Sequence, residues 1–203
     1  MDFKSFDMGS YSRNMIDFKS SIYFGKEYEY KYNCFGFEYV NSRQETYTTT
    51  DGKGNMSVHT RTVYDTNYRY GIIVDFNDIK DLLIQSNGAK SFEYEYKTES
   101  INFNNNFNVS SQNELTSAKF LTPKIILIIE EMQSLFYGID FEFNYDSKLC
   151  ISFEDDIVKS LKSINSLSNP SIFKEEISGK TQMIKLNKLL EYIHQLMVYS
   201  NNN

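Results

Sequence analysis

The stretch FNNNFNVSSQNELTSAKFLTPKIILIIEEMQSLFYGIDFEFNYDSKLCISF, residues 103–153, decides the fold class of this chain. It predicts a strand with a Phe-x-x-x-Phe-x-Val pattern, then an apolar helix, then a hairpin in which apolar and polar residues alternate. No long linker separates these segments. A helix followed directly by two half-apolar strands indicates an α+β domain in which the helix covers one face of an antiparallel sheet.

The central helix has clear boundaries in the sequence. Thr122 is a suitable N-cap and Pro123 a suitable first helical residue, because the N–H that proline lacks would have no partner there. The apolar residues that share one helical face are Ile125, Ile128, Ile129, Met132 and Phe136. Ile126 and Leu127 widen this face, and Gly138 follows the end of the helix. We therefore expect a deeply buried helix with a narrow polar side.

Alternation of apolar and polar residues predicts the rest of the sheet. It indicates strands at residues 139–145 and 149–153, an antiparallel strand pair at 28–39, and strands at 68–76 and 92–96.

The segment Asp51-Gly-Lys-Gly-Asn55 predicts the tip of a long hairpin that joins two threonine-rich strands. Sixteen Phe and 16 Tyr residues make the predicted sheet rich in aromatic side chains.

Shorter segments predict further helices. Asn77 or Asp78 can cap a single helical turn through Ile79, Leu82 and Leu83. A second helix is expected to follow Glu154, Asp155 and Asp156, through Ile157, Val158, Leu161 and Ile164. A last amphipathic helix is expected at residues 180–199, with apolar residues spaced 3, 4, 3, 4. We expect it to dock on the same domain, and pairing with a second copy as a homodimer is the alternative.

Length and composition are those of one globular domain. A chain of 203 residues buries roughly 70% of the surface that its unfolded form exposes, which is enough for one substantial core. We expect a single α+β domain over residues 1–203. Residues 1–22 are interpreted as a helix or an irregular N-terminal arm, and residues 200–203 as a disordered tail.

The charge disfavours a nucleic-acid partner. The net charge is −6, whereas nucleic-acid-binding proteins use clustered Lys and Arg to displace counterions from phosphates. The basic residues of the 43–69 hairpin, which are Arg43, Lys53, Arg61 and Arg69, are interspersed with Glu45, Asp51 and Asp65. Mixed charges favour a solvated strand face over a polyanion site.

The sequence contains little that indicates secretion or insertion into a membrane. Cys34 and Cys150 lie far apart in sequence and are interpreted as buried free thiols. No apolar run approaches the ~18 residues of a membrane-spanning helix, and the N-terminus lacks the apolar stretch of a signal peptide. We expect a soluble, cytoplasmic chain.

The chain has few residues suited to catalysis or metal binding. His59 and His194 are the only histidines, and neither has a second ligand at metal-binding spacing. Glu154, Asp155 and Asp156 form the best acidic cluster for general acid and base catalysis, but a solvated first helical turn is the favoured explanation for them. Gly52 and Gly54 lie in a hairpin tip and form no phosphate loop. No catalytic, metal or cofactor residue is therefore predicted.

The order of several motifs resembles a known family. These motifs are Phe103-x-x-x-Phe107-x-Val109-Ser110, Ala118-Lys-Phe-Leu121-Thr122-Pro123, Leu149-Cys-Ile151, and a final Leu-rich helix. In this order the chain resembles the bacterial domain-of-unknown-function family 3137 over roughly residues 25–198, and Gly71-Ile-Ile-Val74 matches as well. The resemblance implies a shared core and no active site. Members of that family commonly carry transmembrane helices ahead of the soluble part.

The residues thus favour a non-catalytic binding module over an enzyme. In this interpretation a Tyr- and Phe-rich sheet binds a protein or an apolar small molecule, because tyrosine offers apolar area with a polar tip. The first alternative is a hydrolase-like enzyme that uses the acidic cluster at Glu154–Asp156 with His59 or His194. The second alternative is polyanion binding through the 43–69 hairpin.

Overall fold

The computed structural model describes residues 6, 13–24, 29–77, 79–86, 92–157, 170–171 and 184–200. The strands are β1 (Arg13–Phe24), β2 (Glu29–Thr50), β3 (Met56–Asp75), β4 (Leu82–Gln85), β5 (Tyr94–Tyr96), β6 (Asn108–Ser111), β7 (Asp140–Phe143) and β8 (Lys148–Phe153). The helices are α1 (Ile101–Asn106), α2 (Glu114–Phe120), α3 (Pro123–Leu135) and α5 (Ile184–Ser200).

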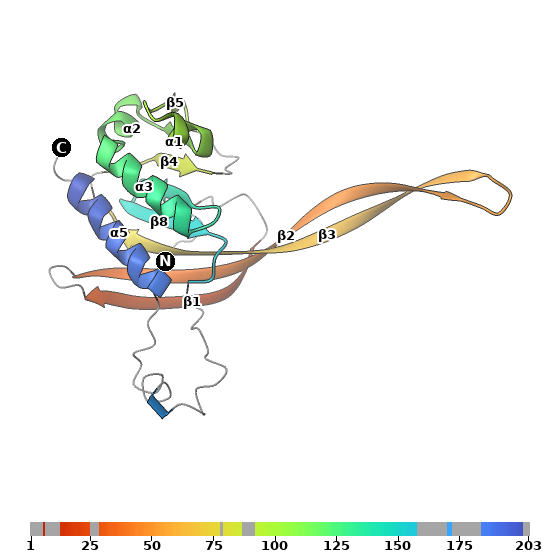
Figure 1. Ribbon diagram of the computed structural model, residues 1–203, viewed down its shortest axis with the longest axis horizontal. Coiled ribbons are helices and arrows are strands. Elements are labelled where there is room, and N and C mark those ends of the chain that lie inside the picture. The colour runs from red at the N-terminus through yellow and green to blue at the C-terminus, as the bar shows by residue number, and fades with distance from the viewer. Residues whose placement is uncertain are drawn as a thin grey trace.

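The strands form one antiparallel sheet, which confirms the predicted α+β class (Figure 1). The order of its eight strands is β1-β2-β3-β8-β7-β4-β6-β5. Strands β2 and β3 are far longer than the others, with 22 and 20 residues, and they extend together beyond the rest of the molecule. Among the described helices, none has the length and apolar character needed to cross a bilayer.

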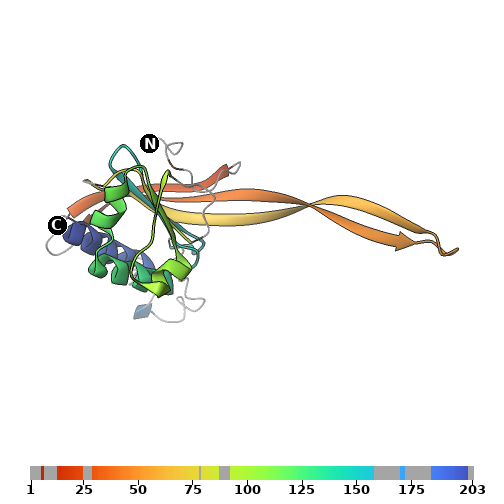
Figure 2. The ribbon, with the colours of Figure 1, turned by 90° about the horizontal axis from the view of Figure 1, so that it is seen from above.

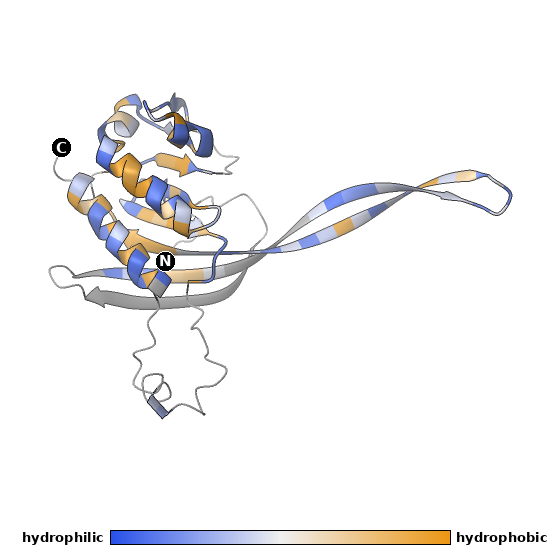
Figure 3. Cartoon of the chain, viewed as in Figure 1, coloured by the Kyte–Doolittle hydropathy of each residue, from blue (hydrophilic) through white to orange (hydrophobic). Residues whose placement is uncertain are grey.

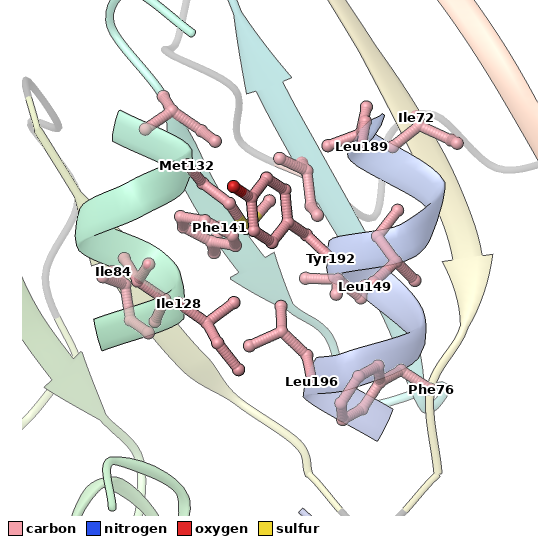
Figure 4. Close-up of a cluster of buried hydrophobic side chains, with 14 of the residues drawn as sticks. Ile72, Phe76, Ile84, Ile128, Met132, Phe141, Leu149, Leu189, Tyr192 and Leu196 are labelled. Carbon is pink, nitrogen blue, oxygen red and sulfur yellow. The ribbon is translucent and has the colours of Figure 1, made fainter. Parts of the chain in front are cut away.

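Helices α3 and α5 lie side by side over one face of the sheet (Figures 2 and 4). Figure 4 shows Met132 and Ile128 of α3 and Tyr192 and Leu196 of α5 around the strand residue Phe141. The core below the helices is built largely from Phe, Ile and Leu side chains that are less than 2% exposed, among them Phe103, Phe141, Phe143, Phe153, Ile72 and Leu82. Both predicted covers of the sheet are thus in place.

The start of α3 agrees with the prediction. The Thr122 hydroxyl accepts a hydrogen bond from the backbone N–H of Ile125 at 3.5 Å, and Pro123 is the first residue of the helix. The buried residues of α3 are Ile125, Ile126, Ile128, Ile129 and Met132. Leu127, however, is 60% exposed, so the prediction that it widens the buried face is wrong. Gly138 adopts a φ of +63° after the helix, a conformation that favours glycine.

The strand predicted from Phe103 onward is only half correct. Residues Ile101–Asn106 form α1, whose N-cap Ser100 accepts a hydrogen bond from the backbone N–H of Phe103. Phe103 and Phe107 are four residues apart, a helical spacing, and their ring centroids lie 5.0 Å apart. The strand begins only at Asn108.

The helical turn predicted through Leu82 and Leu83 is also wrong, because Leu82–Gln85 is strand β4. All four of its residues are buried. A short apolar run that is covered on both sides shows no strand period, so its sequence cannot distinguish a strand from a helix.

Strand β2 continues through Asn33, where the alternation of apolar residues changes phase. Tyr32 and Cys34 belong to the main core, whereas Phe35 faces the opposite side of the sheet, with Phe6, Ile73 and Cys150. The predicted strand pair at residues 28–39 is therefore a single strand within a sheet that is buried on both faces. Residues Arg13–Phe24 form β1, so residues 13–22 of the predicted arm belong to the sheet, and Phe6 is buried against Phe35, Ile73 and Cys150.

Gly71 of β3 lies at a close approach between strands. A Cβ at this position would lie 2.3 Å from the carbonyl oxygen of Ile151 and 2.4 Å from the ring of Phe35. Only glycine fits there without a shift of the backbone or of the Phe35 ring. The absence of a side chain at Gly71 lets β2, β3 and β8 lie side by side with the Phe35 ring packed over Gly71.

The last helix docks on the body of the same chain, as expected. Leu186, Leu189, Leu190, Ile193 and Leu196 of α5 are at most 6% exposed. Pairing with a second copy is therefore not needed to bury this face. The helix predicted through Val158, Leu161 and Ile164 lies outside the described residues. Of the predicted tail 200–203, Ser200 is instead the last residue of α5, and residues 201–203 lie outside the described residues.

We predict that Leu189→Ala lowers the free energy of unfolding by about 2–5 kcal/mol, because it leaves a cavity beneath α5. The matched variant Leu127→Ala removes the same atoms from an exposed site on α3, and it changes the free energy by less than about 0.5 kcal/mol. Urea denaturation followed by circular dichroism measures both values. Equal effects of the two variants would contradict the docking of α5.

Candidate functional site

One residue of the acidic cluster, Asp155, connects the two covering helices. Asp155 accepts hydrogen bonds from the backbone N–H of Tyr137 and from Lys185 Nζ, both at 2.9 Å. Tyr137 follows the end of α3, and Lys185 lies in the first turn of α5. Asp155 thus ties the end of one covering helix to the start of the other. Glu154 and Asp156 on either side of it are exposed.

The charge state of Asp155 does not suit general acid catalysis near neutral pH. Partial burial raises its pKa, but the hydrogen bonds from Lys185 and from the Tyr137 N–H outweigh burial, and the pKa lies below its ordinary value. A general acid at neutral pH needs a raised carboxyl pKa. The interactions of Asp155 with Lys185 and Tyr137 are retained at neutral pH, and they weaken as the pH falls through this lowered pKa.

The two histidines lie away from this cluster. His59 is on the exposed part of β3, where Nε2 lies 2.9 Å from the Thr49 hydroxyl and the ring stacks on Tyr47. His194 is half-buried on α5, nine residues beyond Lys185, or about 14 Å along the helix axis. The structure therefore does not bring either histidine to Asp155.

The cysteines are buried free thiols, as predicted. Cys34 lies in the main core and Cys150 on the opposite face of the sheet, so they are separated by the sheet itself. Among the described residues, no group of three or more His, Cys, Asp or Glu side chains is placed to hold a metal ion.

The most distinctive surface is the outer part of the β2–β3 hairpin, residues 40–66, which we call the distal hairpin. The β1 ladder ends at Tyr39, and the β8 ladder ends at Tyr70. Beyond these points β2 and β3 pair only with each other, through Thr50 and Met56 at the tip. The distal hairpin is about 33 Å long and stands clear of the body in both views (Figures 1 and 2).

The tip of the distal hairpin lies at residues 51–55, as the sequence predicts, and Asp51 holds it together. Its carboxylate accepts hydrogen bonds from the backbone N–H groups of Lys53 and Asn55 at 2.9 and 2.8 Å, and from the Asn55 side chain at 2.9 Å. These bonds, led by the one from the Asn55 side chain, lower the pKa of Asp51. Gly54 has a φ of +83°, which favours glycine.

One face of the distal hairpin carries the charged residues of its two strands. Arg61 binds Glu45 at 2.9 Å, and Arg43 binds both Glu45 and Asp65, at 3.0 and 3.1 Å. The hydrogen bonds from Arg61, aided by the charge of Arg43, lower the pKa of Glu45. The guanidinium of Arg61 also lies 5.7 Å from the ring centroid of Tyr47. The positive charges on this face are thus paired within the hairpin.

The other face has no charged residue. Strand alternation and the register place on it Ser42, Gln44, Thr46, Thr48, Thr50, Met56, Val58, Thr60, Thr62, Tyr64 and Thr66. All of these side chains are exposed. Met56, Val58 and Tyr64 are 73%, 69% and 69% exposed. Figure 3 shows apolar segments near the tip and about halfway along an otherwise largely polar ribbon.

The base of the hairpin is anchored by Arg69. Its Nη2 binds the Asp140 carboxylate and the Gly138 carbonyl oxygen, and its Nε donates to the Ser152 hydroxyl. Asp140 also accepts from the backbone N–H and the hydroxyl of Ser86. Arg69 is only 8% exposed, so its grouping with the surface cations of the 43–69 hairpin is wrong. Its burial depends on contacts with β7 and β8, which lie far from it in the sequence.

No family model matches the chain, and no curated protein or solved structure shows significant similarity to it. The resemblance to family 3137 therefore stays a prediction.

We predict that Asp140→Asn lowers the free energy of unfolding by about 3–5 kcal/mol, because it leaves the buried guanidinium of Arg69 without its counter-charge. Asp75→Asn is the matched control. It breaks an exposed ion pair with Lys148, and it costs less than about 1 kcal/mol. Equal losses in chemical denaturation would show that Arg69 does not need the charge of Asp140.

Proposed function

We propose that this protein is a binding protein and that the distal hairpin is the element that contacts a protein partner. The observation that carries the proposal is a two-stranded ribbon, about 33 Å long, whose side chains beyond the body are almost all exposed. A two-stranded hairpin without a core is at best marginally stable in water. The distal hairpin therefore adds little to the stability of the fold, and a contact outside the body accounts for its length.

The distal hairpin carries several of the exposed large apolar and aromatic side chains of the described chain. Among the described phenylalanine side chains all but Phe92 are buried, so they serve the core. The distal hairpin instead exposes Tyr47, Tyr64 and Met56. Tyrosine, methionine and arginine are enriched at protein interfaces.

The shape of the distal hairpin favours a protein over a small molecule. Small-molecule sites are concave and enclose most of the ligand, whereas a projecting ribbon has no enclosing walls. Its two outer edges also leave backbone N–H and C=O groups of β2 and β3 without a neighbouring strand in the described chain. Such edges pair readily with an extended segment of a partner.

The charges disfavour polyanion binding. The distal hairpin contains three cations, Arg43, Lys53 and Arg61, and three acids, Glu45, Asp51 and Asp65, so its net charge is 3 − 3 = 0. Two of the cations are held by acids of the hairpin itself. Polyanion binding depends on cations that are free to replace counterions.

We predict that the body folds without the distal hairpin. Asn41 and Asp65 are paired across the ladder, so an Asn-Gly turn can replace residues 42–64. The shortened protein should unfold in one cooperative transition, with a free energy within about 1 kcal/mol of the full chain. Loss of cooperative unfolding would show that the hairpin belongs to the folding unit.

We predict that a photo-cross-linking phenylalanine derivative at position 64 captures a protein partner in the native cells. The same group at position 145 is the control, because Tyr64 and Tyr145 are similarly exposed, at 69% and 60%, but only Tyr64 lies on the distal hairpin. Discrete cross-linked products are expected from position 64 alone. Products from position 145 alone, or from neither position, would overturn the proposed function.

A further inference from the structure

The uncharged face of the distal hairpin differs from an ordinary solvated surface. A surface designed to stay well solvated is given roughly 25–35% charged residues. This face has eleven exposed residues and no charge, while the opposite face of the same strands holds Arg43, Glu45, Arg61 and Asp65. Both faces are equally free of the body, so folding does not require this separation of charge. The separation is explained if the uncharged face is covered in the functional state.

We propose that the uncharged face of the distal hairpin binds the same face of a second copy of this chain, with the two hairpins antiparallel. This inference rests on the proposed function and names its partner. The face is self-complementary, because six of its eleven residues are threonines and none brings a charge that needs an opposite charge.

The charge distribution selects the antiparallel arrangement. The whole chain has a net charge of −6 and the distal hairpin has none, so the body carries the excess of six acids. Antiparallel hairpins place the two bodies at opposite ends of a ribbon about 33 Å long, well beyond the Debye length of about 8 Å at physiological salt. Parallel hairpins would bring the two acidic bodies together.

The apolar residues fit the same arrangement. Val58 and Tyr64 lie on one strand, six residues apart, and both are 69% exposed. A two-fold axis between Thr60 and Thr62 places Val58 of each copy against Tyr64 of the other. A two-fold contact uses the same patch twice, so one pair of residues gives two apolar contacts. Two ribbons of the same right-handed twist can pack face to face in this way.

The size of the face predicts a weak dimer. A ribbon about 33 Å long and about 10 Å wide presents a face of roughly 330 Å² in projection, so few side chains of each copy can enter the interface. Association should therefore depend on concentration over the micromolar range and above.

Sedimentation velocity of the full chain, from about 5 µM to about 500 µM, tests the proposal. We predict that the weight-average mass rises towards that of two chains. Val58→Lys should weaken association at least tenfold, because it places a charge in the uncharged interface. The matched control Ser57→Lys adds the same charge to the neighbouring residue on the opposite face, and it should associate like the unmodified chain.

A charge pair across the interface tests the register. Tyr64→Glu alone should also weaken association at least tenfold. A mixture of the Val58→Lys and Tyr64→Glu proteins should form a heterodimer, because the new lysine then faces the new glutamate. A mixture that stays monomeric would overturn the antiparallel register. Circular dichroism confirms that each variant is folded.

The outcomes separate this inference from the proposed function. An unmodified chain that remains monomeric at every concentration, or equal effects of Val58→Lys and Ser57→Lys, would overturn the self-association. If position 64 still cross-links to a different protein in that case, the proposed function stands and only the identity of the partner changes. If position 64 captures nothing, both fail.

Discussion

The buried guanidinium of Arg69 is the contact on which the arrangement of this molecule depends. It lies where β3 leaves the body, and it reaches β8 through Ser152 and β7 through Asp140. Asp140 also accepts two hydrogen bonds from Ser86 at the end of β4. A buried charge is stable only when it is paired and hydrogen-bonded. One ion pair therefore joins four neighbouring strands and fixes the base from which the distal hairpin projects.

Elements with a local signal could be predicted from the sequence. Thr122 and Pro123 mark the start of α3, and Asp51 and Gly54 mark the hairpin tip, because caps and turns need particular residues at particular positions. Strand β4 and the continuity of β2 could not be predicted. Their residues are buried on both faces of the sheet, as Leu82–Gln85 show, and the alternation that identifies a half-exposed strand is then lost.

The candidate site was predictable only in part. The tip sequence indicates a long hairpin, and the acids among its basic residues indicate an exposed strand face, which the ion pairs of Arg43 and Arg61 confirm. The uncharged face depends on the register between Thr48 and Val58, which is visible only once β2 and β3 are paired. Arg69 could not be distinguished from its exposed neighbours, because its burial depends on strands that lie about 70 and 80 residues later in the chain.

An exposed ribbon with two open edges risks indiscriminate pairing with other strands. The faces of the ribbon can also stack on other molecules, and the separation of charge in the distal hairpin restricts this second kind of association. Stacking on the charged face would desolvate Arg43, Glu45 and Arg61, which costs more than their exposed pairs return. Only the uncharged face can be covered without that cost. An association limited to one face closes after two copies, because a two-fold contact uses the face of each copy completely. A ribbon uncharged on both faces would instead continue to stack, so in the proposed self-association the charged face would limit the assembly to a pair.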